Sequence, residues 1–196
     1  MAFTLKDGKE LIALARNSIS AHLENKDVII SGEIKKRYSE KQGVFVTLHK
    51  HGELRGCIGF PEPILQLYDA VAKAAQSAAF GDPRFPPLGK EEYKDITVEI
   101  SVLTKPELIT VKNPDEYPKH ITIGKDGLII RSTFGSGLLL PQVAPEWNWN
   151  EQEFLNHTCQ KAGLPSEFWK EGACNIYRFQ AQIFKEEDGK VIEVKD

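Results

Sequence analysis

The sequence has few cysteines and little net charge, and each scarcity excludes a class of protein. The three cysteines Cys57, Cys159 and Cys174 are too few and too scattered for a disulfide framework, and their odd number leaves one unpaired. A formal net charge of −3 disfavours a dedicated nucleic-acid binder, which usually has a basic face. We therefore expect reduced thiols in a reducing compartment and no nucleic-acid partner.

The sequence also lacks long hydrophobic runs and familiar catalytic motifs. No apolar stretch approaches the roughly 18 residues that a membrane span needs, and the first nine residues have no signal-peptide core. We therefore expect a cytoplasmic protein with no membrane partner. There is no P-loop, no GxGxxG after a strand, no HExxH, no GxSxG and no CxxC pair. Standard motifs therefore do not name a reaction.

The chain does contain clear helical and strand patterns. Leu11, Ala15, Ile19 and Leu23 recur every four residues behind a capping-box sequence, which predicts an amphipathic helix. Strands are indicated by alternation of apolar and polar residues, most clearly over 96–102. The expected helices are Lys6–Asn25, Ile64–Ala79 and Asn150–Ala162. Two hairpins are expected, one of Val44–His49 with Leu54–Phe60 and one of Ile121–Gly124 with Leu128–Ser132. A last strand is expected over 177–183.

Hairpins outnumber strand–helix–strand crossovers in this order of elements. This favours an α+β fold, in which an antiparallel sheet built from hairpins is flanked by helices. A chain of 196 residues suits one domain or two joined lobes. No linker is identifiable, so we expect residues 1–196 to form a single domain with two sub-lobes. The basic run Lys35–Arg37 is expected to be a solvated loop.

The first hairpin contains the strongest candidates for chemistry. A two- or four-residue loop pairs His49 with Leu54 and so places Cys57 opposite Val46, on the face of the strand that is expected to be buried, with His49 on the other face. His49, His51 and Cys57 would then not converge on one ion. We expect no bound metal and no cofactor.

The same register places Arg55, Cys57 and Gly59 on one face, with Gly56 beside the thiol. Two interpretations are open. Either Cys57 is a small buried hydrophobe and the glycines permit tight packing, or Arg55 lowers the pKa of the thiol and the glycines leave room for a ligand. The second interpretation makes Cys57 and Arg55 catalytic candidates, with Gly56 and Gly59 at a binding site.

Two further segments supply candidate groups. Asp82 and Arg84 lie on a proline-rich loop, where Arg84 could hold an anionic ligand or pair with Asp82 to shape the loop. Glu99 lies in the middle of a strand on its polar face, either as a general base in a cleft or as a solvent-facing side chain.

The string Leu54–Gly59, with sequence LRGCIG, resembles the AMME-syndrome candidate gene 1 protein family. The resemblance covers roughly residues 10–184 and includes four more segments in the same order. These are Asp82–Pro86, Ile100–Thr104, Leu140–Ala144, and the stretch from Phe154–Leu155 to Cys159–Leu164.

The resemblance implies an α+β fold of two joined lobes, with the RGCIG segment beside a cleft. It implies no established activity. It adds Gln142 as a candidate ligand-binding residue, although eukaryotic members often carry Glu at that position. Prokaryotic relatives often occur beside a Memo-type protein and a radical-SAM protein, so these are the implied partners. The leading hypothesis is an enzyme or enzyme component that binds a small molecule or modifies a biomolecule in the cleft near Cys57. The alternative is a non-catalytic partner or adaptor of the Memo-type and radical-SAM proteins.

Overall fold

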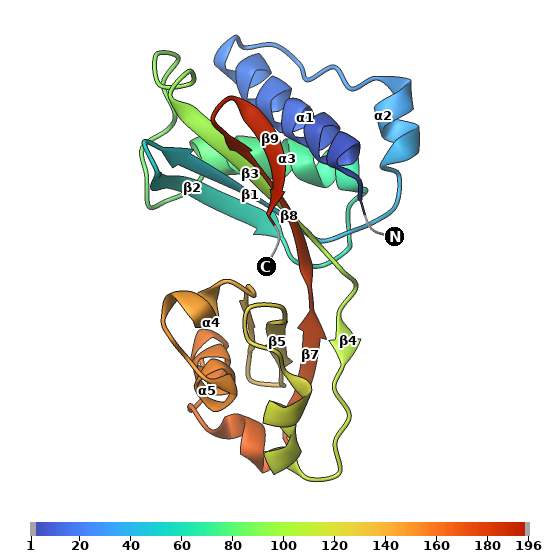
Figure 1. Cartoon of the computed structure of the whole chain (residues 1–196), viewed down its shortest axis with the longest axis vertical. Coiled ribbons are helices and arrows are strands. Elements are labelled where there is room, and N and C mark those ends of the chain that lie inside the picture. Colours follow the sequence, from blue (N-terminus) through green and yellow to red (C-terminus); the bar gives the residue numbers. More distant parts are fainter. Residues whose placement is uncertain (1–2, 195–196) are drawn as a thin grey trace. The chain divides into compact units, whose positions relative to one another are not determined.

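The computed structural model describes residues 3–194, and the chain divides into two compact units. The first unit is made by the residues up to Leu103 together with those from Gln182 onward, and the second by Thr104–Ala181. Each unit has its own antiparallel sheet and its own helices (Figure 1). The predicted α+β class is confirmed.

The first unit is built on a five-stranded sheet with the order β2-β1-β3-β8-β9. The strands are β1 (Val44–Lys50), β2 (Glu53–Phe60), β3 (Ile96–Leu103), β8 (Ala181–Glu187) and β9 (Lys190–Val194). The predicted hairpin of β1 and β2 is confirmed, and β1 also pairs antiparallel with β3. Strand β2 is therefore an edge strand.

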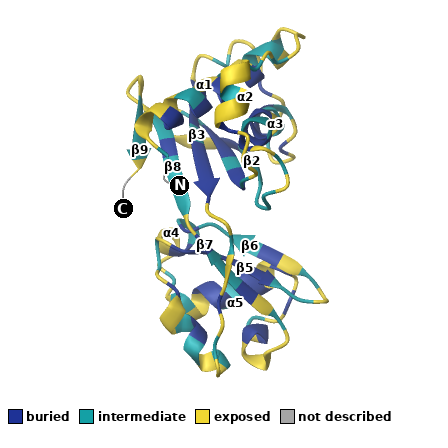
Figure 2. Cartoon of the chain, turned by 90° about the vertical axis from the view of Figure 1, so that its right-hand side faces the viewer, coloured by how far each residue is buried: buried dark blue, intermediate teal, exposed yellow. Residues whose placement is uncertain are grey.

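Two long helices, α1 (Leu5–Leu23) and α3 (Leu67–Phe80), contribute with one face of this sheet to a hydrophobic core. That face, the helix face, carries Val44, Val46 and Leu48, which are fully buried. Figure 2 colours most of β3, in the same sheet, as buried. A capping box between Thr4 and Asp7 starts α1, as the sequence predicted. The predicted helix from Ile64 begins only at Leu67.

The basic run predicted as a loop instead ends a short helix, α2 (Gly32–Arg37). The hydroxyl of Ser31 accepts a hydrogen bond from the backbone N–H of Ile34, which caps this helix. The three basic side chains occupy its last turn, where the helix dipole favours positive charge.

The predicted register of the first hairpin is wrong at Cys57. Strand β2 has an irregularity after Leu54, so that Leu54 pairs with His49 but Gly56 pairs with Leu48. Cys57 therefore lies opposite Thr47 and not opposite Val46. As a result Cys57 shares a face with Phe45, Thr47 and His49, and we call this the thiol face of the first sheet.

The second unit is built on a four-stranded sheet with the order β4-β7-β5-β6. Its strands are β4 (Glu107–Leu108), β5 (Gly127–Arg131), β6 (Ser136–Leu139) and β7 (Asn175–Phe179). Its helices are α4 (Val143–Glu146), α5 (Glu151–Lys161) and the short 3-10 helices η1 (Pro114–His120) and η2 (Phe168–Glu171). A separate core includes Leu128, Phe154, Trp169 and Ile176.

Two strand predictions in the second unit are wrong. The segment Ile121–Gly124 forms a turn, and β5 pairs instead with β6 and β7. The predicted strand over 177–183 is divided at Gln180 into β7 and β8, which belong to different sheets. Ile121 is nevertheless buried, because the turn packs it into the core of the second unit.

Candidate functional site around Cys57

Cys57 lies at one end of a row of polar side chains on the thiol face. Its direct neighbour on β1 is Thr47, and the neighbour of Thr47 on β3 is Glu99. Directly opposite side chains in a sheet share a face and lie about 5 Å apart. The hydroxyl of Thr47 donates a hydrogen bond to Sγ of Cys57 at 3.3 Å. The structure therefore brings Cys57 and Glu99, two predicted site residues, onto one face with Thr47 between them.

The predicted pair Asp82 and Arg84 contacts the backbone of Cys57. The carboxylate of Asp82 accepts a hydrogen bond from the backbone N–H of Cys57 at 2.9 Å, and Arg84 donates to the carbonyl oxygen of Cys57 at 3.2 Å. Arg84 also donates to Asp82 at 2.7 and 3.0 Å. The pair thus offers the edge strand β2 one acceptor and one donor, as the backbone of a further strand would.

The Asp82 carboxylate is ionised because of these contacts. The hydrogen bonds from Arg84 and from the backbone of Cys57 hold the pKa of Asp82 well below its ordinary value, against the opposing effect of burial. Asp82 is only 4% exposed, whereas the side chain of Arg84 is about half exposed. Arg84 is therefore a structural partner of Asp82 that still presents part of its guanidinium to solvent.

Arg55 has a different partner from the one predicted. Its buried guanidinium forms an ion pair with Glu92 at 2.9 Å and donates to the carbonyl oxygen of Pro86. Glu92 also pairs with Lys50, and hydrogen bonds from Arg55 and Lys50 lower the pKa of Glu92 to about 2. Glu92 lies in a charged stretch that is typical of an ordinary protein surface, so no feature of the sequence indicates its role.

The thiol of Cys57 is protonated at neutral pH. Burial raises the pKa of Cys57 and the carboxylates of Asp82 and Glu99 raise it further, while the Thr47 hydrogen bond and Arg84 oppose the increase. Arg55, which the sequence offered as a group that could lower the pKa of this thiol, is paired with Glu92 instead.

The glycines of the RGCIG segment permit close packing. A Cβ atom on Gly56 would lie 2.2 Å from the carbonyl oxygen of Ala78 in α3. A Cβ atom on Gly59 would lie 2.4 Å from Phe45 and from the carbonyl oxygen of Val44. For Gly56 and Gly59 the structure therefore favours the packing interpretation over an open ligand site.

A polar cavity of about 280 Å³ adjoins the row at Glu99. Its lining includes His49, Thr97 and Glu99 from β1 and β3, with Lys185 from β8. His49 lies two residues from Thr47 on β1, so the register places it diagonally from both Cys57 and Glu99, about 7–8 Å away for such positions. The sequence prediction placed His49 and Cys57 on opposite faces, and the irregularity in β2 brings them to the same one.

The predicted residue Gln142 lies in the second unit, at the N-cap of α4. Its side-chain oxygen is buried and has no hydrogen-bond partner within residues 3–194. It does not belong to the Cys57 row, which is made entirely by the first unit.

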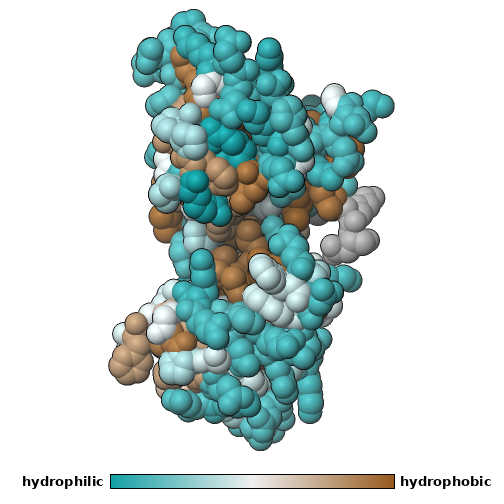
Figure 3. Space-filling view, turned by 90° about the vertical axis from the view of Figure 1, so that its left-hand side faces the viewer, coloured by the Kyte–Doolittle hydropathy of each residue, from teal (hydrophilic) through white to brown (hydrophobic). Residues whose placement is uncertain are grey.

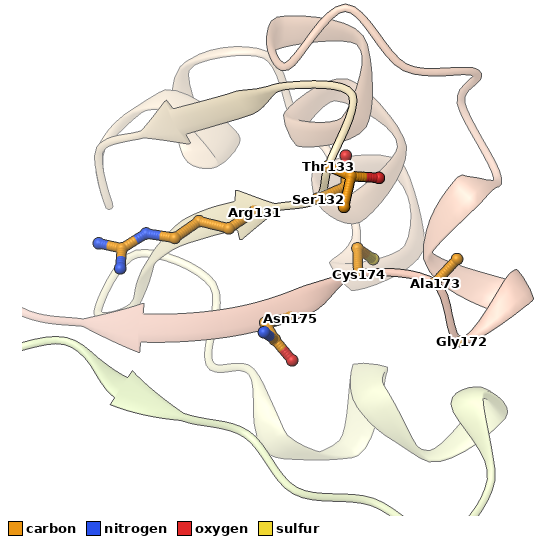
Figure 4. A pocket seen from close by; sticks show the side chains of 7 residues that line it. All are labelled: Arg131, Ser132, Thr133, Gly172, Ala173, Cys174 and Asn175. Atoms are coloured by element: carbon orange, nitrogen blue, oxygen red, sulfur yellow. The ribbon is translucent and has the colours of Figure 1, made fainter.

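The second unit has a cavity of about 440 Å³ that the sequence did not indicate. Figure 4 shows its seven lining residues, with Ser132 and Thr133 beside Cys174 and the side chain of Arg131 extending away from the thiol. The guanidinium of Arg131 lies over the ring of Tyr177 at 4.8 Å. Burial raises the pKa of Cys174, so this thiol too is protonated at neutral pH.

Three further observations concern metal ligands, membrane-spanning helices and the surface of the described part of the chain. In residues 3–194 no group of three or more His, Cys, Asp or Glu side chains is arranged to hold a metal ion. Within the same range no helix is both long and apolar enough to cross a membrane. On the side of the molecule drawn in Figure 3, hydrophilic residues make up most of the surface of each unit.

The fold and the site define a class: two-unit α+β proteins with a cysteine in a row of polar side chains on one face of an antiparallel sheet. The chain belongs to the AMMECR1 family, whose model matches residues 12–184. It is 50% identical over 182 residues to a protein of Methanothermobacter thermautotrophicus, covering 92% of this chain and 95% of the other. A Methanopyrus kandleri protein is 52% identical over 188 residues, covering 94% and 91%.

A solved structure also resembles the chain along most of its length. The crystal structure of an uncharacterized protein from Pyrococcus horikoshii matches with a TM-score of 0.89 and 46% sequence identity, covering 96% of this chain and 97% of the other. The family and the fold are thereby established.

Proposed function

We propose that the chain is an enzyme, or a component of one, that binds a small polar molecule on the thiol face of the first sheet. The observation that carries this proposal is the polar row of Cys57, Thr47 and Glu99, which adjoins the polar cavity at His49 and Lys185. Cavities of roughly 300 Å³ and more are the usual size of small-molecule sites.

In this proposal Cys57 makes the reactive contact with the bound molecule. Its thiol is protonated, so a nucleophilic role requires a base to accept the Sγ proton. Glu99, two strands from Cys57 with Thr47 between them, and His49 on the diagonal are the two candidate proton acceptors. Each is beyond direct hydrogen-bond reach of Sγ, so the proton would pass through the Thr47 hydroxyl or a water molecule. Asp82 and Arg84 position the thiol by fixing the backbone of Cys57, and the exposed part of Arg84 is available to an anionic group.

The proposal is tested by measuring which small molecules the purified protein retains from a metabolite extract, with detection by mass spectrometry. We expect wild type and Cys174→Ala, a matched cysteine variant in the second unit, to retain the same compound. Cys57→Ala and Glu99→Gln should lose it while keeping wild-type circular dichroism. Equal retention by Cys57→Ala and Glu99→Gln, or no retained compound in wild type, would contradict the proposal.

A second candidate function is that of a non-catalytic partner of Memo-type and radical-SAM proteins. The observation that favours it is the close packing at Gly56 and Gly59, which leaves no open ligand space at these two positions beside Cys57. This candidate predicts that a Memo-type or a radical-SAM protein co-purifies equally with wild type and with Cys57→Ala. It fails if neither protein co-purifies with wild type.

A further inference from the structure

Three aromatic rings in the second unit form a stacked ladder that ends at the surface. The ring of Trp149 stacks on His157, with centroids 3.7 Å apart and planes inclined by 12°. Trp147 lies nearly parallel to Trp149, with centroids 6.1 Å apart and planes inclined by 18°. Trp147 is 67% exposed, so the outer end of the ladder is open to a ligand.

The backbone holds this ladder in place. Asn148, between the two tryptophans, has a φ of 55°, a left-handed conformation that asparagine tolerates better than most residues. Its N–H donates to the carbonyl oxygen of Pro145, and the N–H of Trp149 donates to that of Ala144 at 2.9 Å. An aromatic surface fixed in this way loses little conformational entropy when it binds.

The charged residues closest to the two tryptophans along the chain are glutamates. Glu146 precedes Trp147, and Glu151 and Glu153 lie in the first turn of α5. Between Gln142 and Gln160 the sequence contains no lysine and no arginine. The ladder therefore lies in an acidic stretch, which repels phosphate groups and attracts cations.

We propose that Trp147 and its flanking glutamates bind a basic segment of a partner protein, with an arginine side chain stacked on the Trp147 ring. A cation over an indole ring is attracted by the negative face of the ring, and tryptophan is the best such platform. Arginine fits better than lysine because its guanidinium is planar and weakly hydrated, so it can stack on the ring and still pair with a carboxylate.

The test uses hexa-arginine as the probe, follows the indole N–H signal of Trp147 by NMR in the proteins that contain it, and measures the dissociation constant of every protein by isothermal titration calorimetry. We expect this signal to shift in a saturable way and the affinity to fall as salt is added. Trp147→Ala should raise the dissociation constant about two- to fivefold, and the double variant Glu146→Gln, Glu151→Gln by a similar factor. Hexa-lysine should bind more weakly than hexa-arginine.

Phe134→Ala is the matched control, because Phe134 is 79% exposed in the same unit but has no carboxylate within two residues along the chain. It should bind hexa-arginine as wild type does. The proposal is overturned if Trp147→Ala binds as tightly as wild type while both proteins remain folded, or if adenosine monophosphate shifts the Trp147 signal more strongly than hexa-arginine. A shift that appears without any peptide as protein concentration rises would assign the surface to a second copy of the chain, and would also overturn it.

Discussion

The ionisation of the Cys57 thiol depends on its burial, on two carboxylates and on a hydrogen bond from Thr47. Burial and two carboxylates favour the protonated thiol, and the hydroxyl of Thr47 favours the thiolate by donating a hydrogen bond to Sγ. Of the three cysteines, Cys159 is fully buried and burial raises its pKa to about 11. We therefore expect the three thiols to differ in reactivity for reasons that can be tested one contact at a time.

Thr47→Val should make Cys57 less reactive. The substitution keeps the shape of the side chain but removes the donor, so the pKa of Cys57 should rise further and less of the thiol should be ionised at pH 8. Its alkylation by iodoacetamide should slow about two- to fivefold, because the greater nucleophilicity of a more basic thiolate offsets part of the loss. Mass spectrometry of each cysteine peptide measures these rates, with the unchanged rate of Cys174 as the internal control. An equal or faster rate at Cys57 in the variant would show that the hydroxyl does not stabilise the thiolate. Cys159 should be the slowest of the three in both proteins.

Asp82→Asn should destabilise the protein in a pH-dependent way. In the folded chain the pKa of Asp82 lies below its ordinary value of 3.8, so the ionised form stabilises the fold above that pH. This contribution is lost as the pH falls below 3.8 towards the folded-state pKa. Because Arg84 is half exposed, we expect a loss of only about 1 kcal/mol at neutral pH.

The measurement for Asp82 is urea unfolding of both proteins over a series of pH values. The two free energies of unfolding should differ at pH 7 and converge as the pH falls from 3.8 towards the folded-state pKa of Asp82. Asp69→Asn, which alters an exposed i,i+4 pair with Lys73, is the control and should change little. A difference that stays constant down to the lowest pH would mean that the charge of Asp82 does not contribute.

At the scale of elements, strand β2 is shaped by the helix that packs on it. The backbone of Gly56 lies against the carbonyl oxygen of Ala78, and this close approach leaves no room for a side chain. The register of β2 changes immediately before Gly56 and brings Cys57 to the thiol face. The RGCIG segment therefore combines two roles, tight helix–sheet packing at Gly56 and presentation of the thiol at Cys57.

Gly56→Ala should destabilise the protein by about 3 kcal/mol, because α3 must move away from β2 to admit the methyl group. Gly89→Ala is the matched control, because a Cβ atom at this position has no neighbour within 4 Å. It should change the free energy of unfolding by no more than about 0.5 kcal/mol. Chemical denaturation measures both. Equal stability of the two variants would mean that α3 and β2 are not in close contact at Gly56.

The elements that could be predicted from sequence are those specified locally. The capping residues Thr4 and Asn150 marked two helix starts correctly, because a cap depends only on the next three residues. The register at Cys57 could not be predicted, because contact with a distant helix determines it. Ile121 and Ile123 have the alternating pattern of a strand, but they lie in a turn. Both side chains pack in or against the core of the second unit.

The candidate site was predictable to a similar degree. Cys57, Asp82, Arg84 and Glu99 are brought together, and each was conspicuous as a reactive or charged residue within a strand or a stiff loop. Glu92 was not predictable, because its role depends on an ion pair with Arg55, which is 37 residues away in the sequence. Thr47 could have been found as the one polar residue in the run Val44–Leu48.

At the scale of the whole molecule, the second unit is an insertion between β3 and β8 of the first. These two strands are neighbours in the first sheet. The inserted segment closes on itself, since the N–H of Thr104 donates to the carbonyl oxygen of Gln180 at 2.8 Å, and the N–H of Gln180 donates to the hydroxyl of Thr104 at 2.8 Å. An inserted segment with paired ends and its own core has the features of an independently folding domain.

Residues 104–181 expressed alone should therefore fold. Their core includes fully buried aromatic residues such as Phe154 and Trp169, and their paired ends need no partner from the rest of the chain. We expect a single cooperative thermal transition in the near-ultraviolet circular dichroism, reversible on cooling. Phe154→Ala should lower the midpoint of that transition strongly, because it leaves a large cavity, and Glu167→Gln at the surface should not. A fragment without a cooperative transition would show that the second unit depends on the first for its stability.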